Sequence, residues 1–301
     1  MLEDPSRSLP VLDPTGRARL LSCGAAILHA RLGLAARGHA CRVLLLPDAA
    51  RPELLATLTV DGRAAPSEHE LALADAVPRR ATDRNPFDDR PVPDEVREAL
   101  RTAAEQEGAW LRFVGDDGSD DAVELQVLLS HADDSQRSDP AYLAELAAWR
   151  DDRPAEGVPS RALSSVPTAL RASTWVVRDF DAGAARATVA AAGAEAPADT
   201  PADPPHAEHP SVLVLGTEAD DRRDWLVAGQ ALGRVLLEAT RAGVAAQPLT
   251  QVLEVPVLRG RLRHALGVLG QPQMLLRVGY GSPVPTSGRR PVEDVVTVRV
   301  P

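Results

Sequence analysis

The chain of 301 residues has a formal net charge of −10, because 43 aspartates and glutamates outnumber 33 basic residues, all of which are arginine. This acidic balance argues against nucleic acid or an anionic membrane as the main partner, since both attract a basic surface. No apolar run approaches the roughly 20 residues of a membrane-spanning helix, MLEDPSRSLP is unlike a signal peptide, and two cysteines suggest a reducing compartment, so we expect a cytoplasmic protein.

The first part of the chain is predicted to contain a helix followed by short strands. Apolar residues recur at steps of three and four between residues 20 and 34, which predicts a helix that Gly38 would end. The run CRVLLLPD then predicts a buried strand. Segments 57–62 and 68–77 are interpreted as short strands, or as one strand and a linker.

The next part of the chain is predicted to be mainly helical. Residues 91–107 form a clear amphipathic pattern, with Asp94 as a plausible N-cap and Val96, Leu100 and Ala103 on one face. AWLRFVGDDG predicts a strand and a turn. Two polar helices follow between residues 120 and 150, and Pro140 suits the first position of the second one.

The last part of the chain begins with a connector and contains the longest helix. Residues 181–210 are rich in alanine, proline, aspartate and glycine, which is typical of a low-complexity connector. We then expect a buried strand in HPSVLVLGTE, the longest helix in RRDWLVAGQALGRVLLEATRAG, a loop in VAAQPLTQ, a short helix in LRGRLRHALG and a core strand in PQMLLRVGYG. Strands and helices mix without regular alternation, so the sequence favours an α+β fold.

Two of the predicted helices are spaced alike, which suggests an internal repeat. At a constant offset of 205 residues the matching pairs are Gly24 and Gly229, Ala26 and Ala231, Leu32 and Leu237, and Gly38 and Gly243. Alanine-rich helices that end in glycine can also look alike by chance. A true repeat would make the chain two copies of one unit, which is a dimer within one polypeptide.

An arginine cluster in RRATDRNPF is a candidate phosphate site. Arg80, Thr82 and Arg84 alternate along the chain, so an extended backbone would place them on one face. Guanidinium forks and a hydroxyl are groups that bind phosphate. A second basic pair, Arg289 and Arg290, lies near the C-terminus. Surface salt bridges are the alternative for either cluster, because every basic residue of this chain is arginine.

Other polar and aromatic residues offer weaker candidates. The seven histidines show no spacing of four residues, and Cys23 and Cys41 supply no set of four zinc ligands, so we expect no metal site. Tyr142, Trp149 and Trp175 are expected to be packing anchors rather than a substrate cage.

Three segments together resemble a known family. RRATDRNPFDDRPVPDEVREAL, VAGQALGRVLLEATRAGVAAQPLTQ and PQMLLRVGYGSPVPTSGRRPVEDVV resemble FMN-dependent nitroreductases, and nearly the whole chain resembles their actinobacterial Acg-like branch. That branch is a fused, degenerate tandem of two nitroreductase units. The resemblance implies a nitroreductase-like α+β fold, with an N-terminally incomplete first unit at 1–78 and a second unit at 79–301 that carries a lid or insert around 115–210. It also implies a monomeric intramolecular pseudo-dimer.

The resemblance implies roles for eight positions. These are Arg80, Thr82, Arg84, Pro248, Leu249, Thr250, Arg289 and Arg290. The first three would hold the FMN phosphate and ribityl chain, and one of the last two would close on the phosphate. The middle three would lie along the flavin ring, with the Thr250 backbone N–H near N5.

The implied function is transfer of a hydride from NAD(P)H to a nitro or quinone-type small molecule, by chemistry that FMN supplies. One departure favours a second interpretation. Family members carry an N-x-Q-P-W segment that helps to cradle the flavin, whereas this chain begins after that point and has only QEGAW at 106–110. The alternative is therefore a catalytically weak or inactive Acg-like protein that binds or sequesters flavin in a stress or dormancy context. We expect weak FMN binding in either case.

Overall fold

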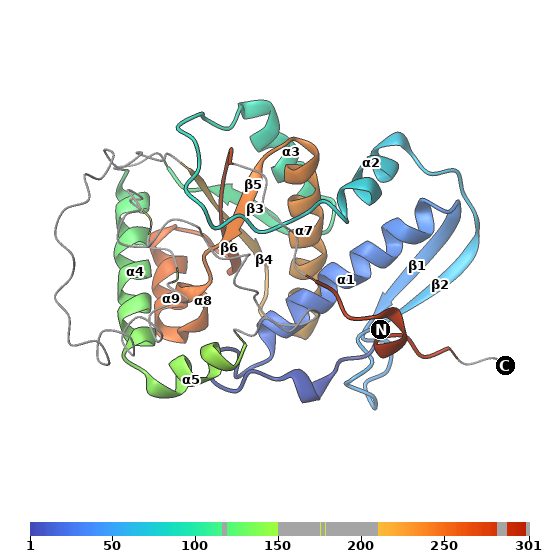
Figure 1. The fold of residues 1–301 in the computed structure, drawn as a ribbon, viewed down its shortest axis with the longest axis horizontal. Coiled ribbons are helices and arrows are strands. Elements are labelled where there is room, and N and C mark those ends of the chain that lie inside the picture. The colour runs from blue at the N-terminus through green and yellow to red at the C-terminus, as the bar shows by residue number, and fades with distance from the viewer. Residues whose placement is uncertain (116–118, 150–174, 176–177, 179–209, 282–287, 299–301) are drawn as a thin grey trace.

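A four-stranded antiparallel sheet lies at the centre of the larger part of the chain (Figure 1). The computed structural model describes residues 1–115, 119–149, 175, 178, 210–281 and 288–298. The sheet has the order β3-β4-β6-β5, and its strands are β3 (Trp110–Phe113), β4 (Ser211–Thr217), β5 (Ala245–Pro248) and β6 (Gln271–Gly279). The predicted strands in AWLRFVGDDG, HPSVLVLGTE and PQMLLRVGYG are therefore confirmed.

Helices cover both faces of this sheet, and alternation along the strands divides the core into two clusters. Leu213 and Leu215 of β4 pack with α3 (Asp94–Glu105) and α7 (Arg222–Arg241) on one face. Val212 and Val214 pack on the other face with the helices around α4, in keeping with the period of two along a strand. The helices of that second face are α4 (Asp120–Arg137), α8 (Gln251–Glu254) and α9 (Pro256–Ala265).

The two long helices that resemble one another in sequence, α1 (Arg17–Ala35) and α7, pack against each other through facing glycines. A Cβ on Gly24 would lie 2.3 Å from the carbonyl oxygen of Leu226, and a Cβ on Gly229 would lie 2.1 Å from that of Leu21. The two contacts are reciprocal, because Gly24 and Leu21 correspond to Gly229 and Leu226 at the offset of 205 residues that the sequence shows. The close packing agrees with two related units, but the pseudo-dimer interpretation stays a prediction.

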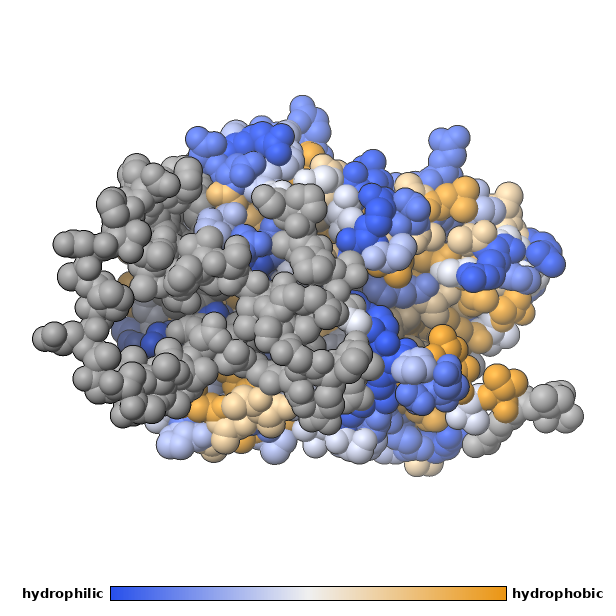
Figure 2. All heavy atoms as spheres, viewed as in Figure 1, coloured by the Kyte–Doolittle hydropathy of each residue, from blue (hydrophilic) through white to orange (hydrophobic). Residues whose placement is uncertain are grey.

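On the other side of α1 lies a two-stranded hairpin, β1 (His39–Leu45) and β2 (Ala56–Arg63). The expected strands are present, but the prediction that CRVLLLPD is buried is wrong. Leu44 is 58% exposed, and apolar residues reach the surface around this hairpin in Figure 2. A sheet of two strands packed on one helix leaves its outer face in solvent.

Three further local predictions are corrected by the structure. Segment 68–77 is helix α2 (Glu68–Ala76) rather than a strand, because Ser67 and Glu70 form a reciprocal capping box at its start. VAAQPLTQ is not entirely loop, since β5 pairs with β6 along the sheet edge. Asp94 is the first residue of α3 and Pro93 is its N-cap, so the carboxylate lies in the first turn, where it favours the helix dipole.

The helices α4, α5 (Pro140–Ala148) and α9 agree with those predicted from the sequence, whereas α8 was not predicted. Pro140 is the first residue of α5, and the side chain of Asp139 caps it. Short 3-10 turns, η1 (Pro5–Arg7) and η4 (Val292–Asp294), lie near the two ends. The predicted connector lies outside the described residues, as does most of the predicted lid. None of the helices in the described ranges combines the length and apolar character needed to span a bilayer.

Candidate functional site

The segment that carries the arginine cluster runs beside the edge strand β5. The backbone N–H of Asp83 donates to the carbonyl of Ala246 at 3.2 Å. The backbone and side-chain amides of Asn85 donate to the carboxylate of Asp83 at 2.9 and 3.0 Å. Residues 81–86 belong to no helix or strand, so Thr82 and Arg84 lie on a loop beside the sheet edge.

The buried guanidinium of Arg277 holds the segment at 81–86 by a hydrogen bond to its backbone. Arg277 of β6 is 1% exposed and donates to the side-chain oxygen of Gln247 at 2.5 Å and to the carbonyl of Asn85 at 2.7 Å. Its guanidinium also lies over the ring of Phe87, 4.3 Å from the centroid. The sequence analysis missed Arg277, although an arginine inside the apolar run MLLRVG was a visible signal.

Arg80 and Arg289 come from distant parts of the chain but affect each other electrostatically. Arg80 is half-buried, and burial together with the nearby charge of Arg289 lowers its pKa. The charge of Arg290 has a small effect on the exposed Asp4 near the N-terminus. Of the two C-terminal arginines, Arg289 is the one whose charge affects Arg80.

His29 brings helix α1 to the same basic cluster. Burial lowers the pKa of its imidazole, and the charges of Arg80 and Arg289 lower it further. Its Nε2 atom is buried and has no hydrogen-bond partner within the described part of the chain. The sequence was used to judge His29 only as a metal ligand. Its position near the charges of Arg80 and Arg289 was therefore not predicted.

Arg84 has a different electrostatic neighbour. Burial lowers the pKa of Arg84, and the second cause is the charge of Arg178. Arg178 donates to the Thr250 hydroxyl at 3.1 Å and to a Glu254 carboxylate oxygen at 2.6 Å. Burial lowers the pKa of Arg178, but Glu254 and Tyr142 outweigh that effect and raise it. These contacts connect Arg84, through Arg178, with the end of β5.

The three residues predicted beside a flavin ring lie at the end of β5. Pro248 and Thr250 are half-buried, and Thr250 immediately precedes α8. Leu249 is fully buried in the second apolar cluster, and its N–H donates to the carbonyl of Leu275 at 3.0 Å. The Leu249 side chain is therefore part of the core. The half-buried Thr82 lies between the two arginine neighbourhoods along the chain.

The other candidates have structural surroundings. Tyr142 and Trp175 are 5% and 4% exposed and pack in apolar clusters, which confirms them as packing residues. Trp149 is half-buried. Cys23 and Cys41 are both free and half-buried. Within the described ranges, histidine, cysteine, aspartate and glutamate form no group of three or more that could hold a metal ion.

Comparison with known proteins gives one family. Residues 77–280 match the model of the nitroreductase family. The chain is 36% identical over 298 residues to a Mycobacterium tuberculosis H37Rv protein provisionally named an NAD(P)H nitroreductase, covering 97% of this chain and 80% of that protein. It is 32% identical over 301 residues to the provisionally named NAD(P)H nitroreductase acg of the same strain, covering 98% of this chain and 86% of that protein.

Solved structures are less similar. The FMN-dependent nitroreductase NfnB of Mycobacterium smegmatis, in complex with NADPH, is 18% identical and has a TM-score of 0.45, covering 76% of this chain and 100% of that chain. A nitroreductase of Desulfitobacterium hafniense with bound FMN is 13% identical and has a TM-score of 0.42, covering 76% and 98%. Both TM-scores are below 0.5, so the family assignment depends on the sequence matches.

Proposed function

Because this chain belongs to the nitroreductase family, we propose that it is a flavoprotein oxidoreductase that binds FMN and uses NAD(P)H to reduce a small nitro or quinone-type acceptor. Relatives provisionally named NAD(P)H nitroreductases support this proposal. When bound, FMN supplies the hydride chemistry, and the protein supplies binding and orientation.

The observation that carries the proposal is the basic cluster of Arg80, Arg289 and His29. Arg80 is half-buried, and the charge of the exposed Arg289 acts on it and on His29, so an anion placed here would be attracted by both guanidinium groups. A phosphate offers several acceptor oxygens, which fit two guanidinium groups and the buried imidazole nitrogen that has no partner. We infer that these three side chains hold the FMN phosphate.

The remaining predicted contacts extend from this cluster along β5. Thr82 and Arg84 would bind the ribityl chain or the polar edge of the flavin. Backbone groups at Pro248, Leu249 and Thr250 would border the ring, because the Leu249 side chain is occupied in the core. Arg178 would hold the Thr250 hydroxyl and so orient the start of α8.

A flavin titration of the purified protein tests the proposal. Arg80→Ala should weaken FMN binding about tenfold to a hundredfold, because one charge-assisted hydrogen bond contributes roughly 1.5–3 kcal/mol. Arg79→Ala is the matched control, since Arg79 is exposed and pairs with Asp75 at 2.9 Å. Absence of saturable FMN binding, or equal effects of the two substitutions, would contradict the proposal.

A specific observation also favours the second candidate, a flavin-binding protein with little activity. Trp110, the last residue of QEGAW, lies on β3, at the opposite sheet edge from β5. Its indole N–H donates to the carbonyl of Thr217 at 3.3 Å, and its ring packs at Gly216 and Gly270. Trp110 therefore packs against the sheet, away from the residues that we propose to bind FMN. The second function would be favoured if the protein binds FMN but does not oxidise NAD(P)H when nitro or quinone acceptors are present.

A further inference from the structure

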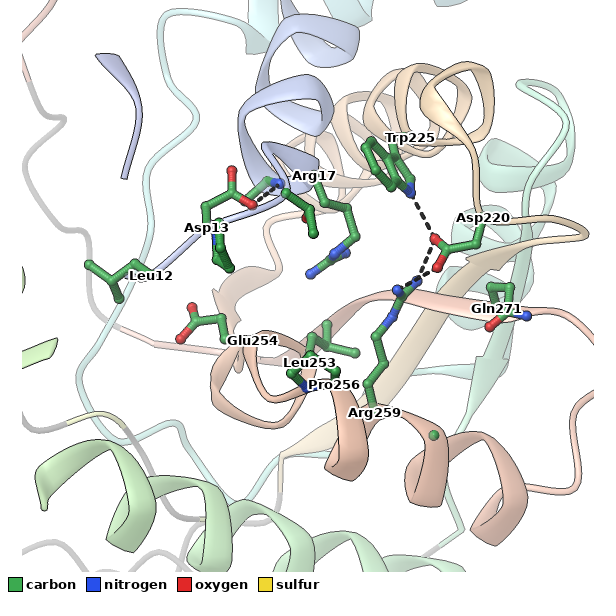
Figure 3. Close-up of a pocket in the computed structure, with 14 residues that line it drawn as sticks. Leu12, Asp13, Arg17, Asp220, Trp225, Leu253, Glu254, Pro256, Arg259 and Gln271 are labelled. Atoms are coloured by element: carbon green, nitrogen blue, oxygen red, sulfur yellow. Dashed lines mark hydrogen bonds and ion pairs between the residues drawn. The ribbon is translucent and has the colours of Figure 1, made fainter. Parts of the chain in front are cut away.

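A second candidate binding site lies in a cavity at the start of α1, where the loop after β4 meets α8 and α9 (Figure 3). The cavity has a volume of about 370 Å³. Its wall is apolar in part, with Trp225 and Leu253, and carries the charged side chains of Arg17, Asp13 and Glu254. This volume is at the small end of the range for ligand pockets, which suits a ligand with one ring.

Arg17 is the charged residue that sets the chemistry of this cavity. It is 7% exposed, and Figure 3 shows its guanidinium pointing into the cavity. One guanidinium nitrogen, Nη1, donates to the backbone and side-chain oxygens of Gln273 at 2.6 and 3.2 Å. These acceptors are neutral, and no carboxylate in the described part of the chain forms an ion pair with Arg17.

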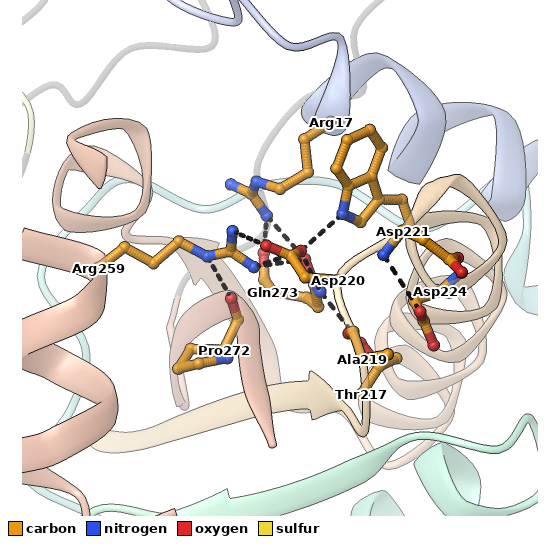
Figure 4. A network of polar contacts seen from close by, with 10 residues as sticks. Arg17, Thr217, Ala219, Asp220, Asp221, Asp224, Arg259, Pro272 and Gln273 are labelled. Carbon is orange, nitrogen blue, oxygen red and sulfur yellow. Dashed lines mark hydrogen bonds and ion pairs between the residues drawn. The ribbon is translucent and has the colours of Figure 1, made fainter. Parts of the chain in front are cut away.

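Two of the nearby carboxylates are already occupied. Asp13 accepts the backbone N–H groups of Ala18 and Arg19 at 3.0 and 2.9 Å, so it caps the start of α1. Asp220 accepts two bonds from Arg259 at 2.7 and 2.9 Å and one from the Trp225 indole at 2.7 Å (Figure 4). Moving either carboxylate to Arg17 would break these bonds.

The third carboxylate, Glu254, is bonded to other residues through its Oε2 atom. It accepts from Arg178 at 2.6 Å and from the side-chain amide of Gln136 at 2.7 Å. Burial, with the neighbouring charge of Arg259, lowers the pKa of Arg17 to about 10, so the guanidinium stays charged at neutral pH. The charges of Asp13, Asp220 and Glu254 partly offset this effect. A buried charge without a direct ion pair is still costly, so this position favours an anionic ligand.

We propose that this cavity binds a small aromatic monocarboxylate, whose carboxylate pairs with the Arg17 guanidinium and whose ring lies against Trp225 and Leu253. A planar carboxylate matches one guanidinium fork. A phosphate dianion fits less well than a monoanion, because the two arginines at the wall, Arg17 and Arg259, already face three carboxylates and each further negative charge adds repulsion. The site is separate from the proposed flavin function and does not require it.

Calorimetric titration with benzoate, in the absence of added flavin, tests this site. We expect saturable binding of benzoate and at least tenfold weaker binding of benzamide, which has the same shape without the charge. Arg17→Gln should weaken benzoate binding at least tenfold and leave benzamide binding nearly unchanged. Arg19→Gln is the matched control on the same helix, since Arg19 pairs with Glu3 at 2.7 Å and does not line the cavity.

Each other outcome would overturn the proposal. Absence of saturable benzoate binding, or equal binding of benzoate and benzamide, would exclude a carboxylate site. Equal benzoate affinities of Arg17→Gln and the unaltered chain would place any binding elsewhere. If Arg17→Gln fails to fold, the comparison of benzoate with benzamide on the unaltered chain decides whether a carboxylate is bound. Benzoate bound in this cavity should then change the tryptophan fluorescence of the unaltered chain, and Trp225→Phe should abolish that change because Trp225 lines the cavity.

Discussion

At the scale of residues, buried polar side chains on one face of β6 support both candidate sites. Gln273 and Arg277 are 0% and 1% exposed and flank Leu275 at steps of two along the strand. Gln273 accepts from Arg17 and donates to Asp220, whereas Arg277 fixes the segment that carries Arg80 and Arg84. The strand thus places a hydrogen-bonding residue beneath each site while its other residues fill the core.

Asp220 gives a prediction for stability as a function of pH. Burial would raise the pKa of its carboxyl, but hydrogen bonds from Arg259, Trp225 and Gln273 together lower it from 3.8 to about 2. Because the folded pKa is the lower one, Asp220 contributes stability that is complete above about pH 4 and is lost as the pH falls towards 2. Asp220→Asn should lower the free energy of unfolding by about 1–3 kcal/mol at pH 7.

Urea unfolding at pH 7, 4 and 2.5 checks this prediction. The difference between Asp220→Asn and the unaltered chain should shrink between the two lower values. Asp75→Asn is the control, because Asp75 is exposed and should show almost no difference at any pH. A constant difference across the three values would contradict the assigned shift.

At the scale of elements, the crossing of α1 and α7 depends on the absence of side chains at Gly24 and Gly229. Added Cβ atoms would meet backbone carbonyl oxygens of the facing helix, which cannot move aside as a flexible side chain can. The two helices therefore approach closely at this point, and the core residues Leu21 and Leu226 lie on either side of the crossing.

Gly229→Ala is expected to destabilise the protein by about 1–3 kcal/mol or more, because the new methyl group would force the helices apart. Gly33→Ala is the matched control in α1, where the nearest atom to an added Cβ is a flexible arginine nitrogen at 3.6 Å. That substitution should be neutral or stabilising by about 0.5–1 kcal/mol, since alanine favours a helix over glycine. Thermal and urea unfolding of both variants measure the contrast. Similar stabilities would show that the crossing tolerates a side chain.

At the scale of the whole molecule, the candidate flavin site is assembled from distant segments. The segment at 80–87, the end of β5 at 248–250 and Arg289 come from separate parts of the chain, and His29 comes from α1. Folding must therefore bring α1 and the C-terminal region together before the proposed phosphate site exists.

This assembly predicts a contrast between neighbouring arginines. Arg289→Ala should weaken FMN binding about tenfold or more and should reduce the preference for FMN over riboflavin, which lacks the phosphate. Arg290→Ala should have a much smaller effect on both affinities, because the charge of Arg289 acts on Arg80 whereas that of Arg290 acts on Asp4. Flavin fluorescence titrations with the two ligands measure the effect. An equal loss from both substitutions, or no preference for FMN in the unaltered chain, would count against the proposed phosphate site.

Features that depend on neighbouring residues could be predicted from the sequence alone. Apolar periodicity predicted α1, α3 and α7, an apolar run predicted β4, and motif resemblance identified the family before any coordinates. The misassigned segments were those whose state depends on detail or on distant partners. The cap at Ser67 makes 68–77 a helix, and pairing with β6 makes part of 244–251 a strand.

The pairing of charges, in contrast, depends on contacts between segments that lie far apart in the sequence. The sequence offered Arg289 and Arg290 as equal candidates, and in the folded chain the charge of Arg289 acts on Arg80 whereas that of Arg290 acts on Asp4. It also left Arg17 indistinguishable from the other arginines, because burial without an ion pair depends on contacts with residues such as Gln273, far along the chain. Packing between distant segments determines which residues become partners, and neither apolar periodicity nor local residue spacing predicts those contacts.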